Sequence, residues 1–378
     1  MINKTAFTFP VGYHPFHKEQ LYNFQLNRWY SLGYARLEDM EEAGKKIRTF
    51  DEWKPVMLQL AEKAVSEDRL MNAAFLYRAA EFYTLPKDPD KEPLYDKFIE
   101  LFYKVFQNDG IERITIPYTD TFLPAIRVSA SGNKKGTIVM HGGFDSFIEE
   151  FYSWMRYFAD YGYEMVAFEG PGQGAALKKY GLPLTYEWEK PVKAVLDNYK
   201  LDNVTLIGIS MGGYLCFRAA AHEPRIARVI ASSIAFDYMQ VPPLPLQWLM
   251  RVFLQFEGLM NYSAKEKMKR MPDHQWSVNN LMYITRTDKP MAAMKTVLQM
   301  NEKNLHSELV KQDVLILTGT DDHFIPLKMH YKQVKALINA RSVTERIFTR
   351  EEQAHNHCQI GNIGLALDTM LKWITEKS

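Results

Sequence analysis

A five-residue segment, Gly-Ile-Ser-Met-Gly at positions 208–212, constrains the fold of this chain more than any other feature. The run 204–207 before it has the character of a strand, and the small residues of 211–222 after it favour a helix that packs closely on a sheet. A strand that turns sharply into a helix leaves little room at the turn, and a glycine two positions before and two positions after Ser210 relieves that crowding. The segment therefore predicts an exposed serine hydroxyl, a candidate nucleophile, although so short a pattern also arises in a strand end with an incidental serine.

Short apolar segments alternate with helical ones from residue 111 onward. The segments with strand character are 111–116, 124–128, 137–140, 164–168, 204–209, 226–231, 314–317 and 343–348. The first two are expected to form a hairpin of edge strands. Strands that alternate with helices in this way predict an α/β fold with a mostly parallel sheet that is covered by helices on both faces.

Two regions of the chain lack this alternation. Up to residue 108 the apolar residues recur at helical spacing, which predicts an all-helical N-terminal domain over 1–108 beside a catalytic domain over 109–378. Between about 238 and 309 the sequence is rich in Met and aromatic residues and has no strand signal. We expect a helical insertion there, after the sixth strand, which acts either as a lid or only as a packing elaboration.

The bulk composition argues against several classes of protein. A formal net charge of +1 over 378 residues gives no electrostatic footprint for nucleic acid. Two cysteines are too few for a disulfide framework and suit a reducing compartment. The N-terminal residues do not form a secretory signal, and no run approaches the roughly 18 apolar residues that span a membrane. We therefore expect a cytoplasmic protein whose partner is a small molecule rather than a nucleic acid or a membrane, with a homodimer left open.

The later part of the chain offers an acid and a base for Ser210, in the order serine, aspartate, histidine. Asp322 lies in a loop just after a predicted core strand, at the sheet edge where open parallel sheets place their sites. Asp321 is the second choice, and either aspartate could instead cap the following helix. For the base we expect His357, which precedes the final helix, rather than His355.

The segment His-Gly-Gly-Phe at 141–144 follows another predicted strand and supplies backbone N–H groups that side chains do not obstruct. We expect Gly143, or Phe144 as the neighbouring alternative, to form an oxyanion hole with the N–H of Met211. The helix that begins at Met211 also directs its positive dipole end toward this point. The alternative is a plain turn beside a core histidine.

Two further patterns bear on cofactors. The pair His355 and His357 would suit a metal if a neighbouring side chain supplied a third ligand, but that spacing in a loop is weak support and leaves Ser210 unexplained. The loop Glu-Gly-Pro-Gly-Gln-Gly at 169–174 has neither the dinucleotide nor the phosphate-loop fingerprint. We therefore expect no metal and no cofactor, and we expect Glu169 to anchor loops near the site.

Four segments together resemble the α/β-hydrolase superfamily. They are His-Gly-Gly-Phe-Asp-Ser at 141–146, Phe-Glu-Gly-Pro-Gly-Gln-Gly at 168–174, Gly-Ile-Ser-Met-Gly-Gly at 208–213 and Ala-His-Asn-His-Cys-Gln at 354–359. With its helical N-terminal region, the chain is similar to the branch that contains 2,6-dihydropseudooxynicotine hydrolase, fungal polyketide-shortening hydrolases and FrsA-like proteins. Members of that branch cleave a carbon–carbon bond next to a carbonyl through a serine triad, with the helical domain closing over the site.

The resemblance implies an α/β-hydrolase fold with Ser210, Asp322 and His357 as the triad. In some carbon–carbon hydrolases of the branch an auxiliary acid follows the sixth strand, and Asp237 is the matching residue here, with aspartate where glutamate is expected. Glu169 stands where many relatives carry aspartate. Relatives known as acylaminoacyl-peptidase-like hydrolases share similar motifs.

We therefore predict a cofactor-independent serine hydrolase that forms an acyl-enzyme on a largely apolar small molecule. The bond cleaved is an ester, an amide or a carbon–carbon bond flanked by carbonyls. Three alternatives stay open at this point: an acylaminoacyl-peptidase-like hydrolase, an acyltransferase, and a ligand-binding protein that keeps the fold without turnover.

Overall fold

An eight-stranded sheet forms the centre of the computed structural model, which describes residues 5–378. The strands are β1 (Glu112–Tyr118), β2 (Thr121–Val128), β3 (Gly136–His141), β4 (Tyr163–Phe168), β5 (Val204–Ile209), β6 (Ile226–Ser232), β7 (Asp313–Gly319) and β8 (Ser342–Phe348). Their order across the sheet is β1-β2-β4-β3-β5-β6-β7-β8. The pairs β1–β2 and β2–β4 are antiparallel and the other pairs are parallel, which confirms the predicted mostly parallel α/β sheet.

The first hairpin differs from its prediction in one respect. β1 lies at the edge of the sheet, but β2 pairs with β1 on one side and with β4 on the other. The burial of the two strands gives the reason, because Leu123, Ala125, Ile126 and Val128 of β2 are all buried, whereas Ile116 is the one buried residue of β1. Only β1 is therefore an edge strand.

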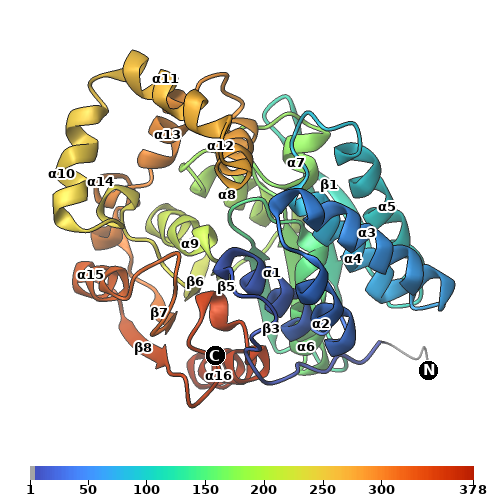
Figure 1. Ribbon diagram of the computed structural model, residues 1–378. Helices are drawn as coiled ribbons and strands as arrows, with labels where there is room; N and C mark the ends of the chain where they lie inside the picture. Colours follow the sequence, from blue (N-terminus) through green and yellow to red (C-terminus); the bar gives the residue numbers. More distant parts are fainter. Residues whose placement is uncertain (1–4) are drawn as a thin grey trace.

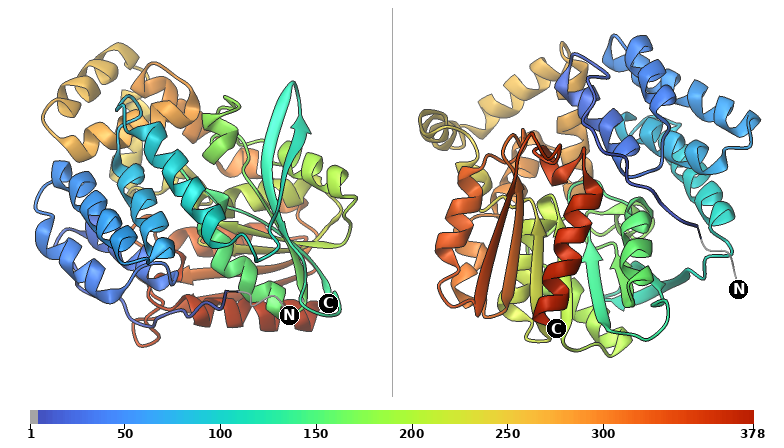
Figure 2. Two further views of the ribbon diagram at one scale, coloured as in Figure 1. Left: turned by 90° about the vertical axis from the view of Figure 1, so that its right-hand side faces the viewer. Right: turned by 90° about the horizontal axis from the view of Figure 1, so that it is seen from below.

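Helices cover both faces of the sheet (Figures 1 and 2). The helices of one face are α6 (Tyr152–Asp160) and α16 (Ile363–Lys377), and those of the other are α8 (Glu189–Tyr199), α9 (Met211–His222) and α15 (Lys328–Ala336). Side chains alternate between the two faces along a strand, so Ile207 and Ile209 of β5 join the first apolar core while Val204 and Leu206 join the second. A strand covered on both sides is apolar almost throughout, which is why 204–209 stood out in the sequence.

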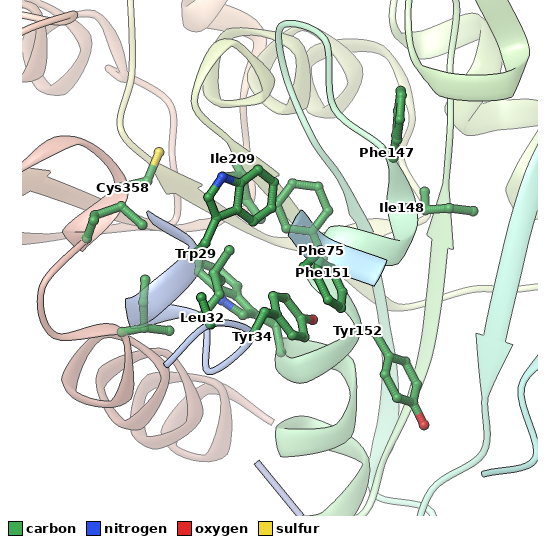
Figure 3. Packing of buried hydrophobic residues seen from close by; sticks show 14 of the residues in the cluster. Trp29, Leu32, Tyr34, Phe75, Phe147, Ile148, Phe151, Tyr152, Ile209 and Cys358 are labelled. Atoms are coloured by element: carbon green, nitrogen blue, oxygen red, sulfur yellow. The ribbon is translucent and has the colours of Figure 1, made fainter. Parts of the chain in front are cut away.

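The N-terminal helices pack against the α6 side of this core. They are α1 (Gln20–Ser31), α2 (Leu37–Lys46), α3 (Phe50–Ser66), α4 (Leu70–Tyr83) and α5 (Lys91–Val105). The rings of Tyr34 and Phe75 stack with their centroids 3.5 Å apart, and the Tyr34 hydroxyl accepts a hydrogen bond from the backbone N–H of Ser153 at 2.8 Å. Figure 3 shows these rings close to Phe151 and Tyr152 of the catalytic region, so a single apolar cluster joins the N-terminal helices to the sheet.

The segment between β6 and β7 is helical. It consists of η2 (Tyr238–Gln240), α10 (Leu244–Phe253), α11 (Glu257–Met268), α12 (Pro272–Thr285), α13 (Pro290–Leu298), α14 (Glu302–Leu305) and η3 (Ser307–Leu309). α11 packs on α12 and α13, while α10 contacts mainly η2, and the two helices α10 and α11 lie at the outer edge of the molecule (Figure 1). Within residues 5–378, no helix combines the length and the apolar character that crossing a membrane requires.

The parallel strands end together at one edge of the sheet. β3 ends at His141, β5 at Ile209, β6 at Ser232 and β7 at Gly319, and their registers bring these ends side by side. Loops at this edge of an open α/β sheet commonly hold the functional groups. In this chain they are the loops that carry the candidate residues named from the sequence.

Candidate active site

Ser210 occupies the sharp turn between β5 and α9. Its φ of 63° and ψ of −123° lie in a region that non-glycine residues rarely adopt, and its backbone N–H is held by a hydrogen bond to Ser232 O at 2.9 Å. A Cβ atom at Gly208 would lie 2.0 Å from the carbonyl oxygen of Gly212, and one at Gly212 would lie 2.6 Å from the carbonyl oxygen of Gly142. The turn therefore requires both glycines, which is the physical basis of the motif.

The structure brings Ser210, His357 and Asp322 together in one chain of hydrogen bonds. His357 Nε2 lies 2.8 Å from Ser210 Oγ, and His357 Nδ1 lies 2.7 Å from Asp322 Oδ2. His357 lies in a short turn, η4 (His357–Gln359), and Asp322 lies in the loop after β7. Both side chains are buried, so water is largely excluded from the bond between them.

Asp322 is held by three further donors. Ser233 Oγ donates to Oδ2 at 2.9 Å, and the backbone N–H groups of Phe324 and Ile325 donate to Oδ1 at 3.0 and 2.9 Å. Burial alone would raise the pKa of Asp322, but His357 and these donors together lower it below its usual value. Ser233 is a residue that sequence reasoning missed, because nothing in the local sequence marks the serine directly after β6 as a partner of the acid.

The pKa of His357 moves in the opposite direction. Burial would lower it, but the facing Asp322 carboxylate raises it above the usual value for histidine. An ionised Asp322 only accepts hydrogen bonds, so the proton of the neutral imidazole resides on Nδ1 and Nε2 is the acceptor toward the Ser210 hydroxyl. The arrangement can therefore take a proton from Ser210.

The second choices from the sequence lie elsewhere. Asp321 pairs with Arg350 at 2.5 Å on the surface. His355 contacts Asn356 at 3.2 Å through Nε2 and packs edge-on against Tyr13. Among residues 5–378 no three His, Cys, Asp or Glu side chains are grouped as a metal site requires.

The geometry distinguishes between the two expected donors of the oxyanion hole. The N–H of Gly143 already donates to Ser146 Oγ at 3.0 Å, whereas the N–H groups of Phe144 and Met211 have no acceptor within residues 5–378. Gly143 lies against the start of α9, because a Cβ atom there would be 2.6 Å from Met211 N. The arrangement favours Phe144 over Gly143 as the donor that accompanies Met211.

Gln173 fixes the shape of this loop. Its Nε2 donates to the carbonyl oxygens of Gly142 and Gly143 at 2.8 and 3.1 Å, and its Oε1 accepts from Gly170 N at 3.1 Å. The sequence pointed to the loop 169–174 but gave no reason to single out its glutamine.

Glu169 joins two backbone segments beside the site. Its Oε1 accepts from Ile148 N at 3.2 Å and its Oε2 accepts from Ala175 N at 2.6 Å. Burial, followed by the charge of nearby Glu149, raises the pKa of Glu169 to about 8. Gly174 is required next to it, since a Cβ atom there would lie 1.8 Å from Oε1.

Asp237 does not contact the triad. Its Oδ1 accepts from Met239 N at 2.8 Å, which caps η2, and its Oδ2 accepts from Gln240 Nε2 at 3.0 Å and from Glu302 N at 3.3 Å. These bonds tie the start of the insertion to its end. They give Asp237 a structural position, and the auxiliary role implied by the resemblance stays a prediction.

A cavity of about 390 Å³ opens directly above Ser210. Its wall is largely aromatic and aliphatic, and it receives side chains from α1, from α4, from the loops around Ser210 and His357, and from the insertion. Representative lining residues are Phe24, Phe82, Phe144, Trp276 and Phe324. A second cavity of about 490 Å³, next to the end of α9, contains none of the triad residues.

Residues 132–357 match the family model of serine aminopeptidases, S33. The chain belongs to this family of α/β-hydrolases. It is 25% identical over 378 aligned positions to the hydrolase LUC6 of Fusarium sp., with 92% of this chain and 87% of that protein covered. It is 28% identical over 280 positions to the 20-hydroxy-prefusarin hydrolase FUS2 of Gibberella moniliformis, with 67% and 66% covered.

Two solved structures share the fold of the hydrolase. The 2,6-dihydroxy-pseudo-oxynicotine hydrolase superposes with a TM-score of 0.65 at 22% identity, covering 92% of this chain and 94% of that one. AbyA5 superposes with a TM-score of 0.69 at 17% identity, covering 90% of each chain. The predicted α/β-hydrolase family, its fold and the assignment as an enzyme are therefore confirmed.

Proposed function

We propose that this hydrolase cleaves an ester, an amide or a carbonyl-flanked carbon–carbon bond of a largely apolar small molecule, with Ser210 as the nucleophile. The observation that carries the proposal is the hydrogen-bonded chain from Ser210 through His357 to Asp322 at the floor of an aromatic cavity. A hydroxyl is a weak nucleophile unless a base is within hydrogen-bond reach, and the His357 Nε2 is at that distance.

In the acylation step, Ser210 Oγ attacks the substrate carbonyl carbon and its proton passes to His357 Nε2. The carbonyl oxygen becomes an oxyanion that accepts hydrogen bonds from the N–H groups of Phe144 and Met211, at the positive end of α9. Asp322 holds the imidazole in orientation and stabilises the imidazolium that forms.

Collapse of this intermediate breaks the bond to the leaving group. His357 returns its proton to the departing oxygen, nitrogen or enolate carbon, and the acyl group stays on Ser210 as an ester. Water then attacks the acyl-enzyme, with His357 again taking the proton, and releases the acid together with free Ser210. No step requires a metal or a cofactor.

The lining of the cavity supports an apolar acyl or leaving group. Phe24 and Phe82 come from the N-terminal helices, Trp276 comes from the insertion, and the charged side chain among the lining residues is Arg28. An apolar wall with few polar groups is typical of sites that bind hydrophobic small molecules.

A substrate panel tests the proposal. Purified protein and its Ser210→Ala variant are assayed with p-nitrophenyl esters of increasing acyl length and with an aryl β-diketone. We expect turnover of at least one class, with the rate of the variant lower by roughly 10⁶-fold for a triad nucleophile. Equal turnover by the variant would contradict the role of Ser210.

The same panel separates the classes of bond. Diketone cleavage would assign the carbon–carbon reaction, and ester turnover without it would assign acyl-oxygen cleavage. Product analysis with an added alcohol distinguishes hydrolysis from acyl transfer, since transfer yields a new ester instead of the acid. Saturable ligand binding with no turnover of any class would favour a binding protein on this fold.

A further inference from the structure

Helices α10 and α11 carry an unusual concentration of exposed apolar side chains. Among residues 5–378, nine of the seventeen large hydrophobic side chains that are exposed lie between 244 and 271. They are Leu244, Leu246, Trp248, Leu249, Phe253, Phe256, Leu259, Tyr262 and Met271, which we name the arm patch. Figures 1 and 2 show both helices at the periphery, away from the sheet. A concentration of exposed apolar side chains on neighbouring helices commonly marks an interaction site.

Helix α10 has the burial pattern of an ordinary surface helix reversed, because its buried residue is polar and many of its exposed residues are apolar. Its one buried residue is Gln247, whose Nε2 donates to the carbonyl oxygens of Gln240 and Pro242 at 3.2 and 2.8 Å. The next residue, Trp248, is 67% exposed, and Leu244 is 77% exposed. A surface helix normally turns its apolar stripe to the core and its polar side to water. Most apolar side chains of α10 are therefore exposed, and only Met250 and Val252 are half-buried.

Unpaired positive charge lies beside the arm patch. Four basic side chains of the same segment form no ion pair within residues 5–378: Arg251, Lys265, Lys267 and Arg270. The acidic side chains of the segment are already compensated, because Glu257 pairs with Lys295 and Glu266 pairs with Lys269. The covering surface must accordingly be apolar and anionic at once.

We propose that α10 and α11 seat the hydrolase on the surface of an anionic phospholipid membrane, in the interface and without crossing it. Aromatic and aliphatic side chains enter the boundary between headgroups and acyl chains, and Lys and Arg contact the anionic headgroups. A second copy of this chain is a poorer occupant, since a two-fold contact would bring the same four cations face to face. The sequence predicted no membrane partner because it lacks a spanning run, and the outward direction of α10 becomes visible only in the fold.

Contact of α10 and α11 with the membrane would place the bilayer near the cavity above Ser210. The segment that bears the arm patch continues directly into α12, whose Trp276 and Ser277 line the cavity above Ser210. An apolar molecule dissolved in the bilayer would then have a short path to the cavity. The membrane contact itself does not depend on the reaction proposed for Ser210.

Vesicle sedimentation tests the proposal. The full chain is mixed with vesicles of phosphatidylcholine alone and with vesicles of phosphatidylcholine and phosphatidylserine. We expect binding to the second set, weakened by added salt because exposed charges are screened. Replacing Arg251, Lys265, Lys267 and Arg270 with Gln should lower the partition coefficient by about 600-fold, since each basic residue contributes about a factor of five near an anionic surface.

Matched control variants distinguish binding through the arm patch from non-specific adsorption of the protein to vesicles. The double variant Trp248→Ser, Phe253→Ser should lose binding to the anionic vesicles. Ile338→Ser replaces an apolar side chain outside α10 and α11 that is more exposed than Trp248 or Phe253, and it should keep binding. The double variant Lys303→Gln, Lys335→Gln should also keep binding. Ester turnover in the absence of vesicles should be the same in all these variants, which keeps this test independent of the one for Ser210.

A dye at position 249 reports the contact directly. Both native cysteines are buried, so Leu249→Cys offers an exposed thiol for a polarity-sensitive fluorophore. Its emission should shift to the blue with the phosphatidylserine vesicles and stay unchanged with phosphatidylcholine alone. Absence of binding to anionic vesicles would overturn the proposal. So would a dimer in sedimentation velocity that the Trp248 and Phe253 substitutions abolish, because a second copy would then cover the patch.

Discussion

The N-terminal helices and the α10–α11 arm are both helical additions to the same sheet, but they meet the rest of the chain in opposite ways. The N-terminal helices bury their aromatic side chains in one apolar cluster with the catalytic region. The arm turns its aromatic side chains outward. The sequence predicts helices in both regions, but a predicted helix alone does not tell which of its sides is covered and by what.

The two regions also differ in how their charged side chains are paired. In the N-terminal region Arg78 is fully buried, pairs with Glu150 and Glu81, and donates to the carbonyl oxygen of Asp145 at 2.7 Å. Burial alone would raise the pKa of Glu81, but Lys91 and Lys178, with Arg78, hold it well below its usual value. The network joins α4 to the loop after β3. In the arm, by contrast, Lys269 pairs with Glu266, but Arg251, Lys265, Lys267 and Arg270 form no ion pair within residues 5–378.

The largest effect is expected at Arg78. Replacing it with Leu leaves Glu150 and Glu81 buried without their shared cation and should lower the free energy of unfolding by about 3–5 kcal/mol. The matched change Arg251→Leu in the arm removes an exposed, unpaired charge and should alter it by about 0.5 kcal/mol or less. Chemical denaturation of both variants measures the difference. Equal losses would break the contrast between the two regions.

Removal of a buried tyrosine hydroxyl is expected to have the second-largest effect on the free energy of unfolding. Tyr34→Phe removes the acceptor of the buried Ser153 N–H and should cost about 1–3 kcal/mol of unfolding free energy. Tyr262→Phe in the arm removes a hydroxyl from a side chain that is 65% exposed and should cost almost nothing. Thermal unfolding of the pair at matched concentration is the measurement. A stable Tyr34→Phe protein would mean that the N-terminal helices are less firmly joined to the core than their contacts indicate.

The pH profile of kcat/KM tests whether substitutions in the α10–α11 arm affect the titration of His357. His357 accepts a proton only when neutral, and its pKa is raised by Asp322, so kcat/KM should rise with pH through a midpoint above 6.5. Below that midpoint the rate should fall about tenfold per pH unit. Arm variants should leave the midpoint in place, whereas Asp322→Asn should lower it and reduce kcat by about 10⁴-fold. A midpoint that moves with arm substitutions would contradict the separation.

The smallest effect is expected from the arm patch itself. Phe253→Ser exchanges an exposed ring for a polar side chain and should change the free energy of unfolding by about 0.5 kcal/mol or less. Denaturant unfolding in the absence of lipid measures it. A loss above about 2 kcal/mol would indicate that the ring packs against its own chain, as expected for buried aromatic side chains.

Much of the catalytic region could be predicted from sequence because its constraints are local. The glycines around Ser210 are fixed by clashes with neighbouring backbone, and the continuous apolar character of 204–209 follows from cover on both faces. The family, the fold and the enzyme class predicted from these motifs are confirmed. The roles of Ser210, Asp322 and His357 stay predictions, although the structure brings their side chains together.

Other features depend on contacts between distant segments, which no local pattern encodes. The preference for Phe144 over Gly143 arises from one side-chain rotamer, that of Ser146, which takes up the Gly143 N–H. Asp237 follows the sixth strand as expected, but its carboxylate is used by η2 and by the start of α14. The outward side of α10 follows from the placement of Gln247 against the loop before it. Each of these requires the tertiary fold.

Covalent labelling of Ser210 tests the central claim most directly. The protein is treated with a fluorophosphonate, its intact mass is measured, and the modified peptide is sequenced. The account predicts a single adduct on Ser210, formed quickly in the native protein, slowly in His357→Ala and not at all in Ser210→Ala. An adduct on another residue, or labelling of Ser210→Ala at the native rate, would contradict it.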